Sequence, residues 1–223
     1  MKNITAKKRL RKSRRITDGG TMAARFIVFE GIDGAGKTTQ AKLLAEKIKY
    51  MGREAALTAE PTELESGKAL RRVLSGAEKK SDCEIATMFT LDRIAHNVHP
   101  TLGIGALLDN GVDVISDRYY YSSLAYQGSV TSYPWVKSLN LDCPEIRRPD
   151  LCIFLDLTPE QSLERISRGR DKLEIFENLE TLTRVRESFF SVFTDLDDNI
   201  AVIDAYRSPE EIAEDIFTLY KSL

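Results

Sequence analysis

A glycine-rich stretch near the N-terminus constrains the fold more than any other feature of the sequence. Residues 31–38 read Gly-Ile-Asp-Gly-Ala-Gly-Lys-Thr and fit the pattern G-x-x-x-x-G-K-[ST]. A short apolar run at residues 25–29 precedes the stretch, and apolar residues at helical spacing follow it. Glycines there allow backbone N–H groups to face phosphate oxygens, and the start of a helix adds partial positive charge. The stretch therefore predicts a strand, a phosphate-binding loop and a helix that hold a nucleoside triphosphate.

The side chains of this loop have expected roles. Lys37 can reach the β- and γ-phosphates and is a candidate catalytic residue, while Thr38 is a candidate Mg²⁺ ligand. The chain contains no Asn-Lys pair and so lacks the N-K-x-D of a GTPase, and 223 residues are few for a large ATPase. A small ATP-dependent kinase fits best. The expected ATP-binding residues are Gly31, Ile32, Asp33, Gly34, Ala35, Gly36, Lys37, Thr38 and Thr39.

The order of predicted elements indicates an α/β fold. Apolar runs of strand length alternate with segments of helical periodicity, as in a parallel sheet covered by helices on both faces. We expect the P-loop NTPase fold, with a five-stranded parallel sheet and a short arginine-bearing lid. Strands are predicted at 25–29, 55–58, 112–116, 151–155 and 200–203. Helices are predicted at 37–51, 66–74, 82–108 with a bend or break at Pro100 and the Gly103/Gly105 pair, from Pro159 onward, 179–196 and 209–219.

Charge separates a basic tail from one domain. Residues 1–21 carry eight Lys or Arg and one acid, a charge of +7, which leaves −9 on residues 22–223 of a chain whose net charge is −2. We expect a disordered extension at 1–21 and a single domain at 22–223. The tail could serve as a nucleic-acid or membrane-surface arm, but we favour an added segment or an early start because Met22 directly precedes the folded pattern. The acidic body argues against nucleic-acid binding.

Cysteine use and hydropathy lead us to expect a cytoplasmic protein with no membrane partner. Three cysteines without a C-x-x-C pair exclude a disulfide framework and a cysteine zinc site. No apolar run approaches the roughly 20 residues of a membrane span. His96 and His99 are three residues apart, but without a third ligand nearby we expect no metal site there.

A tyrosine-rich segment after the third predicted strand identifies the chemistry more closely. Residues 117–128 read Asp-Arg-Tyr-Tyr-Tyr-Ser-Ser-Leu-Ala-Tyr-Gln-Gly, at the strand end where ligands bind in open α/β sheets. Here the sequence resembles the thymidylate kinase family, which carries D-R-Y/H followed by S-S-x-A-Y-Q-G at this place. The resemblance spans about residues 25–206 and includes F-E-G-x-D-G-A-G-K-T-T-Q at 29–40, F-x-x-D-R at 89–93, R-P-D at 148–150, L-D-L at 155–157 and I-D-A at 203–205.

The resemblance implies a nucleoside monophosphate kinase domain at 22–223. It would transfer a phosphoryl group from Mg·ATP to dTMP, giving ADP and dTDP for dTTP synthesis, with ATP and Mg²⁺ as cofactors and a homodimer as the assembly. Two alternatives remain open. One is a kinase for another or broader set of pyrimidine monophosphates such as dUMP, and the other is a non-catalytic nucleotide-binding regulator.

The resemblance also assigns acceptor-binding roles. Asp33 would meet the sugar 3′-hydroxyl, Phe89 would stack on the thymine and Arg93 would donate to a base oxygen. Positions i and i+4 share one face of a helix, so Phe89 and Arg93 could contact one base by its face and its edge. Ser123 and Gln127 resemble further base-contacting positions.

The remaining implied roles concern phosphate charge. Arg118 resembles the arginine that bridges donor and acceptor phosphates, Asp117 the acid beside Mg²⁺, and Glu60 an acid near the acceptor or the metal. The cluster Arg165, Arg168, Arg170 and Lys172 predicts a lid at about 165–175. Because the phosphate loop has Gly34 where some relatives carry a catalytic arginine, we expect Arg168 and Arg170 to supply that charge.

One position departs from the family. Many members read T-R-E-P-G-G after the second strand, whereas this chain reads Thr58-Ala59-Glu60-Pro61-Thr62. Ala59 cannot bind the acceptor phosphate. Either Arg71 or Arg72 takes over that role, or acceptor affinity is lower, or the acceptor differs.

Overall fold

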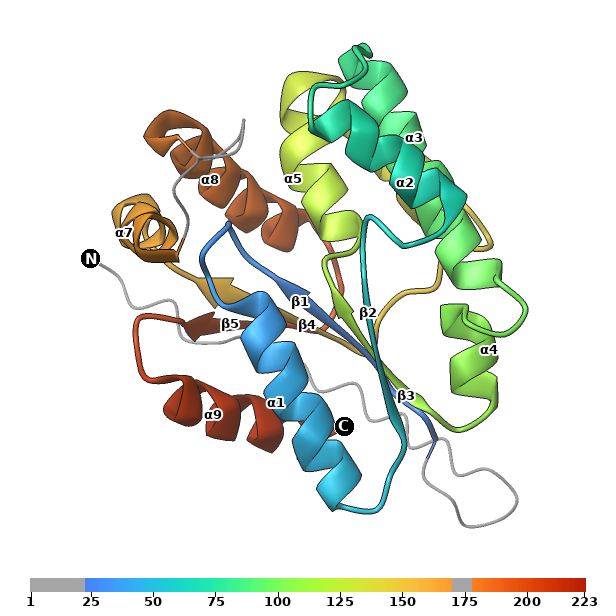
Figure 1. Ribbon diagram of the computed structural model, residues 1–223, viewed down its shortest axis with the longest axis vertical. Helices are drawn as coiled ribbons and strands as arrows, with labels where there is room; N and C mark the ends of the chain where they lie inside the picture. The colour runs from blue at the N-terminus through green and yellow to red at the C-terminus, as the bar shows by residue number, and fades with distance from the viewer. Residues whose placement is uncertain (1–22, 170–177) are drawn as a thin grey trace.

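The computed structural model describes residues 23–169 and 178–223. Its five-stranded sheet is parallel throughout, in the order β2-β3-β1-β4-β5 (Figure 1), which confirms the predicted fold class. The strands are β1 (Phe26–Glu30), β2 (Ala55–Ala59), β3 (Asp113–Asp117), β4 (Leu151–Asp156) and β5 (Ile200–Asp204). The described helices are α1 (Lys37–Tyr50), α2 (Glu65–Leu74), α3 (Asp82–Val98), α4 (Ile104–Asp109), α5 (Tyr120–Val130), α6 (Tyr133–Leu141), α7 (Pro159–Gly169), α8 (Leu179–Asp195) and α9 (Pro209–Lys221).

Burial follows the place of each strand in the sheet. The central strands β1, β3 and β4 are buried almost throughout because helices cover both of their faces. Helices α1 and α9 pack together on one side of the sheet, while α3, α5 and α8 pack together on the other (Figure 1). On that second side the ring centroid of Phe154 in β4 lies 5.0 Å from those of Phe189 and Phe193 in α8. This aromatic cluster fixes α8 against the sheet.

The predicted break in the helical region 82–108 is confirmed. Helix α3 ends at Val98 and α4 begins at Ile104. His99 stabilises the turn between α3 and α4. Its Nδ1 lies 3.2 Å from the Leu102 nitrogen, and its carbonyl accepts from the Gly103 N–H at 3.0 Å. A Cβ at Gly103 would stand only 2.4 Å from that carbonyl oxygen, so the turn requires glycine.

Helices α5 and α6 were not among the predicted helices. Every residue of α5 from Tyr120 to Ala125 is buried, so the segment has no polar face and no apolar stripe. Two of its hydroxyls, those of Tyr120 and Tyr121, donate to Asp198 at 2.5 and 2.9 Å. These bonds fix the start of α5 against the turn that precedes β5.

Some sequence expectations fall outside the described residues. They are the basic extension at 1–21, the lid from Arg170 onward and the side chain of Arg168. Among the helices that the structure describes, none combines the length and the apolar composition that a bilayer crossing requires.

Candidate active site

The predicted site residues gather at the carboxyl ends of the central strands. Phe29 in β1 is level with Asp117 in β3 and with Ile153 in β4, so the loops that follow these strands meet at one edge. The chain turns sharply at Gly31, where a Cβ would lie 2.6 Å from the Leu155 carbonyl oxygen. A side chain at that position would push the phosphate loop away from β4.

Lys37 is a buried cation inside the phosphate loop. Its Nζ donates to the carbonyls of Gly31 and Ile32 at 3.0 and 3.1 Å, and lies 3.8 Å from Asp33 Oδ1. Burial, and then the nearby charge of Arg118, lower the pKa of the Lys37 ammonium, although neighbouring carboxylates oppose the shift. Lys37 therefore sits where added negative charge would be favourable, as the loop motif predicts.

Thr38 and Asp117 meet across the loop. The Thr38 hydroxyl donates to Asp117 Oδ2 at 2.5 Å, which brings together a hydroxyl and a carboxylate oxygen from α1 and β3. Such hard oxygen ligands suit Mg²⁺, which takes only one or two protein ligands when it also binds phosphates. The described residues hold no group of three or more His, Cys, Asp or Glu side chains that could bind a metal by themselves.

Arg118 links the phosphate loop to α5. Its φ of 71° is left-handed, and no other described residue except glycine has a positive φ. The Arg118 N–H donates to the Phe29 carbonyl at 2.9 Å, and its own carbonyl accepts from Ser116 Oγ at 2.8 Å. The guanidinium donates to Asp33 and, at 3.0 Å, to Ser122 Oγ. An unusual backbone conformation is thus held from both sides and aims the side chain at the phosphate loop.

A buried polar cluster joins α3, α5 and the loop after β2. Arg93 is 1% exposed, and its Nε and Nη2 donate to Glu60 Oε2 at 2.9 and 2.6 Å. Arg93 Nη1 donates to Ser123 Oγ at 3.1 Å and also to Asn140. Glu60 in turn contacts His96 Nδ1 at 3.0 Å. The structure therefore brings together Glu60, Arg93 and Ser123, which come from three separate motifs of the sequence.

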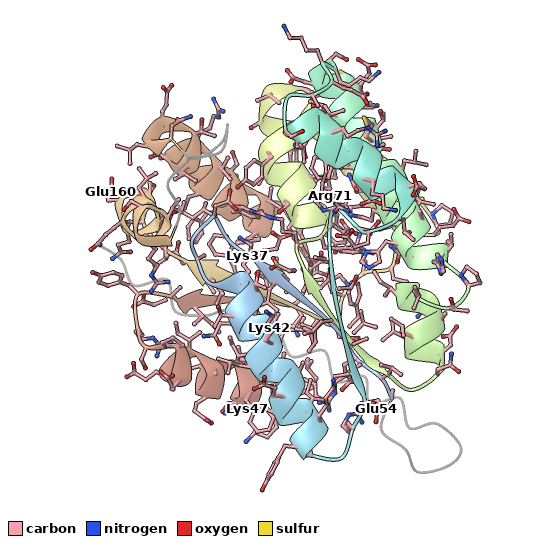
Figure 2. The ribbon with its side chains drawn as sticks, in the orientation of Figure 1. Lys37, Lys42, Lys47, Glu54, Arg71 and Glu160 are labelled. Carbon is pink, nitrogen blue, oxygen red and sulfur yellow. The ribbon has the colours of Figure 1, made fainter. Side chains whose placement is uncertain are left out.

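The loop that follows Ala59, the last residue of β2, is tied to α3. Asp92 accepts from the Thr62 N–H at 2.7 Å and from its hydroxyl at 2.6 Å. Arg71 bends back over this loop, because its Nη1 donates to the Pro61 carbonyl at 2.8 Å. Arg72 instead pairs with Glu78 at 3.0 Å. Figure 2 places Arg71 and Lys37 at one end of the sheet, opposite Lys47 and Glu54.

A family model described as thymidylate kinase matches residues 29–216. The chain belongs to the thymidylate kinase family. A probable thymidylate kinase of Thermococcus gammatolerans is 40% identical over 87% of this chain and 94% of its own length. One from Pyrococcus abyssi is 38% identical over 90% and 97% of the two chains, and a thymidylate kinase of Leptospira borgpetersenii is 35% identical over 87% and 92%.

The structure also gives the positions of other residues to which the sequence assigned roles. Phe89 is half-buried, one turn before Arg93 on α3. Gln127 lies on α5, where with Tyr126 it lines a pocket that extends between α3 and α8. Arg165 donates to the Ala205 carbonyl at 2.7 Å, so its charge is directed at the loop after β5.

Several buried residues of this candidate site were not assigned a role from the sequence. They are Glu30, Asp92, His96 and Asn140, all buried and all bonded to the segments that carry predicted site residues. Glu30 and Asp92 belong to the family motifs at 29–40 and 89–93, so motif membership was the available signal. Asn140 stands in no motif, and only the folded chain places it beside Arg93.

Proposed function

We propose that this chain catalyses phosphoryl transfer from Mg·ATP to dTMP, giving ADP and dTDP. Membership of the thymidylate kinase family supports the activity. The observation that carries the assignment is the contact of Arg118 with Asp33, because it joins the donor loop to α5 and the acceptor side at a shared cation. A residue so placed can neutralise charge on both phosphate groups.

Charge neutralisation and positioning account for the proposed chemistry. The acceptor is already an anionic phosphate, so no hydroxyl needs a general base. Lys37 would hold the β- and γ-phosphates and Arg118 the transferring group. Thr38 and Asp117 would hold Mg²⁺, which screens the phosphate charge when bound. From the sequence alone, Arg168 and Arg170 would add lid charge over the donor.

For the acceptor, we propose that Asp33 meets the sugar, Phe89 stacks on the base, and Arg93, Ser123 and Gln127 read its edge. Glu60 would act by orienting Arg93, because both donors of the Arg93 fork on that side end on its carboxylate. Arg71 would take the phosphate contact that Ala59 cannot make. Its Nη1 bonds to the Pro61 carbonyl, two residues beyond Ala59, and its Nη2 pairs with Glu63 at 2.9 Å, whereas Arg72 is directed toward Glu78.

We also propose a cytoplasmic homodimer. The three cysteines are free thiols, which supports a reducing compartment. Leu91 and Val98 lie seven residues apart on α3, and with Leu102 they are 60%, 51% and 67% exposed. Exposed apolar side chains on α3 and in the link that follows it support pairing with a second copy.

The direct test is ADP release with Mg·ATP against dTMP, dUMP, dCMP, dGMP, AMP and no acceptor. We expect release with dTMP well above every other acceptor, and its loss in Arg118→Ala. Preference for another monophosphate would overturn the substrate while keeping the reaction. Acceptor-independent or absent release from folded, ATP-binding protein would overturn the kinase assignment.

A further inference from the structure

Glu30 is a fully buried carboxylate at the end of β1, directly before the phosphate loop. Its Oε1 accepts from the backbone N–H groups of Tyr119 and Ser122 at 2.9 and 3.1 Å. Its Oε2 accepts from the Ser122 hydroxyl at 2.7 Å. All three donors stand at the start of α5, so one carboxylate caps this helix across the sheet from a different strand.

The same bonds lead to Arg118. Ser122 Oγ donates to Glu30 and accepts from Arg118 Nη1 at 3.0 Å, so a single hydroxyl connects the two charged groups. Tyr119, which Glu30 holds by its N–H, directly follows the left-handed residue Arg118. Glu30 therefore restrains both the backbone and the guanidinium of Arg118.

Burying a charged carboxylate costs free energy, so packing alone does not explain a glutamate at position 30. Burial raises the pKa of the Glu30 carboxyl above its ordinary value, although Arg118 and the Ser122 hydroxyl oppose the shift. A neutral side chain of similar size would avoid that penalty. The negative charge of Glu30 is explained if it orients the neighbouring guanidinium of Arg118.

We propose that Glu30 is a positioning residue for phosphoryl transfer, which fixes Arg118 through Ser122 and the start of α5. The inference rests on the proposed function, in which Arg118 bridges the two phosphates. Glu30 itself touches neither nucleotide.

The kinetic test is a double-mutant cycle. We expect Glu30→Gln to lower kcat for dTMP phosphorylation at least about tenfold, because small misplacement of a charge-stabilising group is costly. In an Arg118→Lys background the same change should cost less than about twofold, since the group it positions is already gone. Ser122→Ala, which removes only the connecting hydroxyl, should behave in the same direction. A kcat loss that multiplies fully in the Arg118→Lys background would overturn the inference.

The matched control is Asp113→Asn. Asp113 is equally buried and accepts from Arg25 N at 2.8 Å and Tyr220 Oη at 2.5 Å, but it stands at the opposite end of β3. Asp113→Asn should lower thermal stability. Any factor by which it lowers kcat should multiply with the factor for Arg118→Lys, as for two independent sites.

A second measurement does not depend on activity. The Nε–H resonance of Arg118 can be assigned by its absence in Arg118→Lys. In Glu30→Gln we expect this resonance to shift and broaden, whereas Asp113→Asn should leave it unchanged. An unchanged resonance in Glu30→Gln would refute the positioning role whatever the kinetics. A changed resonance in a protein without dTMP-dependent transfer would support it and refute the proposed function instead.

Discussion

Burial and the nearby charge of Arg118 make the charged form of Lys37 less favourable in the folded protein. Folding lowers the pKa of Lys37. At any pH below that folded-state pKa, the charged lysine therefore reduces the stability of the folded protein. The penalty disappears as the pH rises through the folded pKa toward the ordinary value. We therefore expect ligand-free Lys37→Met to exceed the wild type in free energy of unfolding at neutral pH, with the difference shrinking toward alkaline pH.

Chemical denaturation across a pH series would measure this difference. Lys42→Met is the control for the loss of a lysine, because Lys42 is exposed on the same helix. ATP should raise the melting temperature of the wild type and of Lys42→Met but not of Lys37→Met. A less stable Lys37→Met at neutral pH would show that its two carbonyl bonds outweigh the burial of charge.

Arg71 and Arg72 are adjacent but point to different partners. If Arg71 holds the acceptor phosphate, Arg71→Ala should raise the KM for dTMP about tenfold or more, the loss expected for a charge-assisted contact. The KM for ATP should stay unchanged. Arg72→Ala removes only an exposed pair and should change either KM by less than about twofold. Equal effects of the two substitutions on dTMP would contradict the assignment.

Gly34 lies where the phosphate loop packs against α7. Gly34 has a φ of +77°, and a Cβ there would lie 3.0 Å from the Ser162 carbonyl oxygen and 3.1 Å from Ile166 Cγ1. Gly52 has the same φ, with nothing within 4 Å of its Cβ position. Alanine at Gly52 should cost about 1–2 kcal/mol, the backbone term alone.

Gly34→Ala should therefore destabilise the protein more than Gly52→Ala, and only Gly34→Ala should weaken ATP binding. Urea denaturation measures the first difference and calorimetric titration with ATP the second. Equal losses of stability would mean that Ser162 and Ile166 move aside without cost.

At the level of elements, the strands were predictable because a fully buried strand is a continuous apolar run. Residues 26–29 and 151–155 are such runs, and both became central strands. Helix α5 was not predicted because its surroundings are buried on every side, which removes the amphipathic signal. Its position depends on Glu30 and Asp198, which are 92 and 77 residues away along the chain from their partners Ser122 and Tyr121.

Within the candidate site, the residues proposed to act directly on phosphates were easier to predict than the residues that hold them. Lys37 and Thr38 follow from a contiguous motif whose chemistry is local. The cluster around Arg93 combines α3, α5, α6 and the loop after β2, and the partners within it lie 30 to 47 residues apart. Such partners have no common local pattern, so only the packed structure identifies Asn140 and His96.

At the scale of the whole molecule, the exposed apolar side chains on α3 predict how two copies meet. Leu91→Glu should convert the proposed dimer into a species of 25.1 kDa, because the substitution would bury a charge in an apolar interface. Light scattering combined with size-exclusion chromatography measures the mass. Tyr50→Glu is the control, since Tyr50 is 94% exposed on α1 and should leave the mass unchanged. A wild-type mass of 25.1 kDa would refute the dimer.

The central place of β1 bears on how the chain folds as it is synthesised. Its neighbours are β3 and β4, which begin at Asp113 and Leu151. At ribosomal rates of about 5–20 residues per second, the apolar residues of β1 precede their second neighbour by on the order of ten seconds. Parallel pairing across such separations is also intrinsically slow. The strand that leads into the phosphate loop is thus translated first and covered late, which makes it the segment of the nascent chain most in need of protection from aggregation.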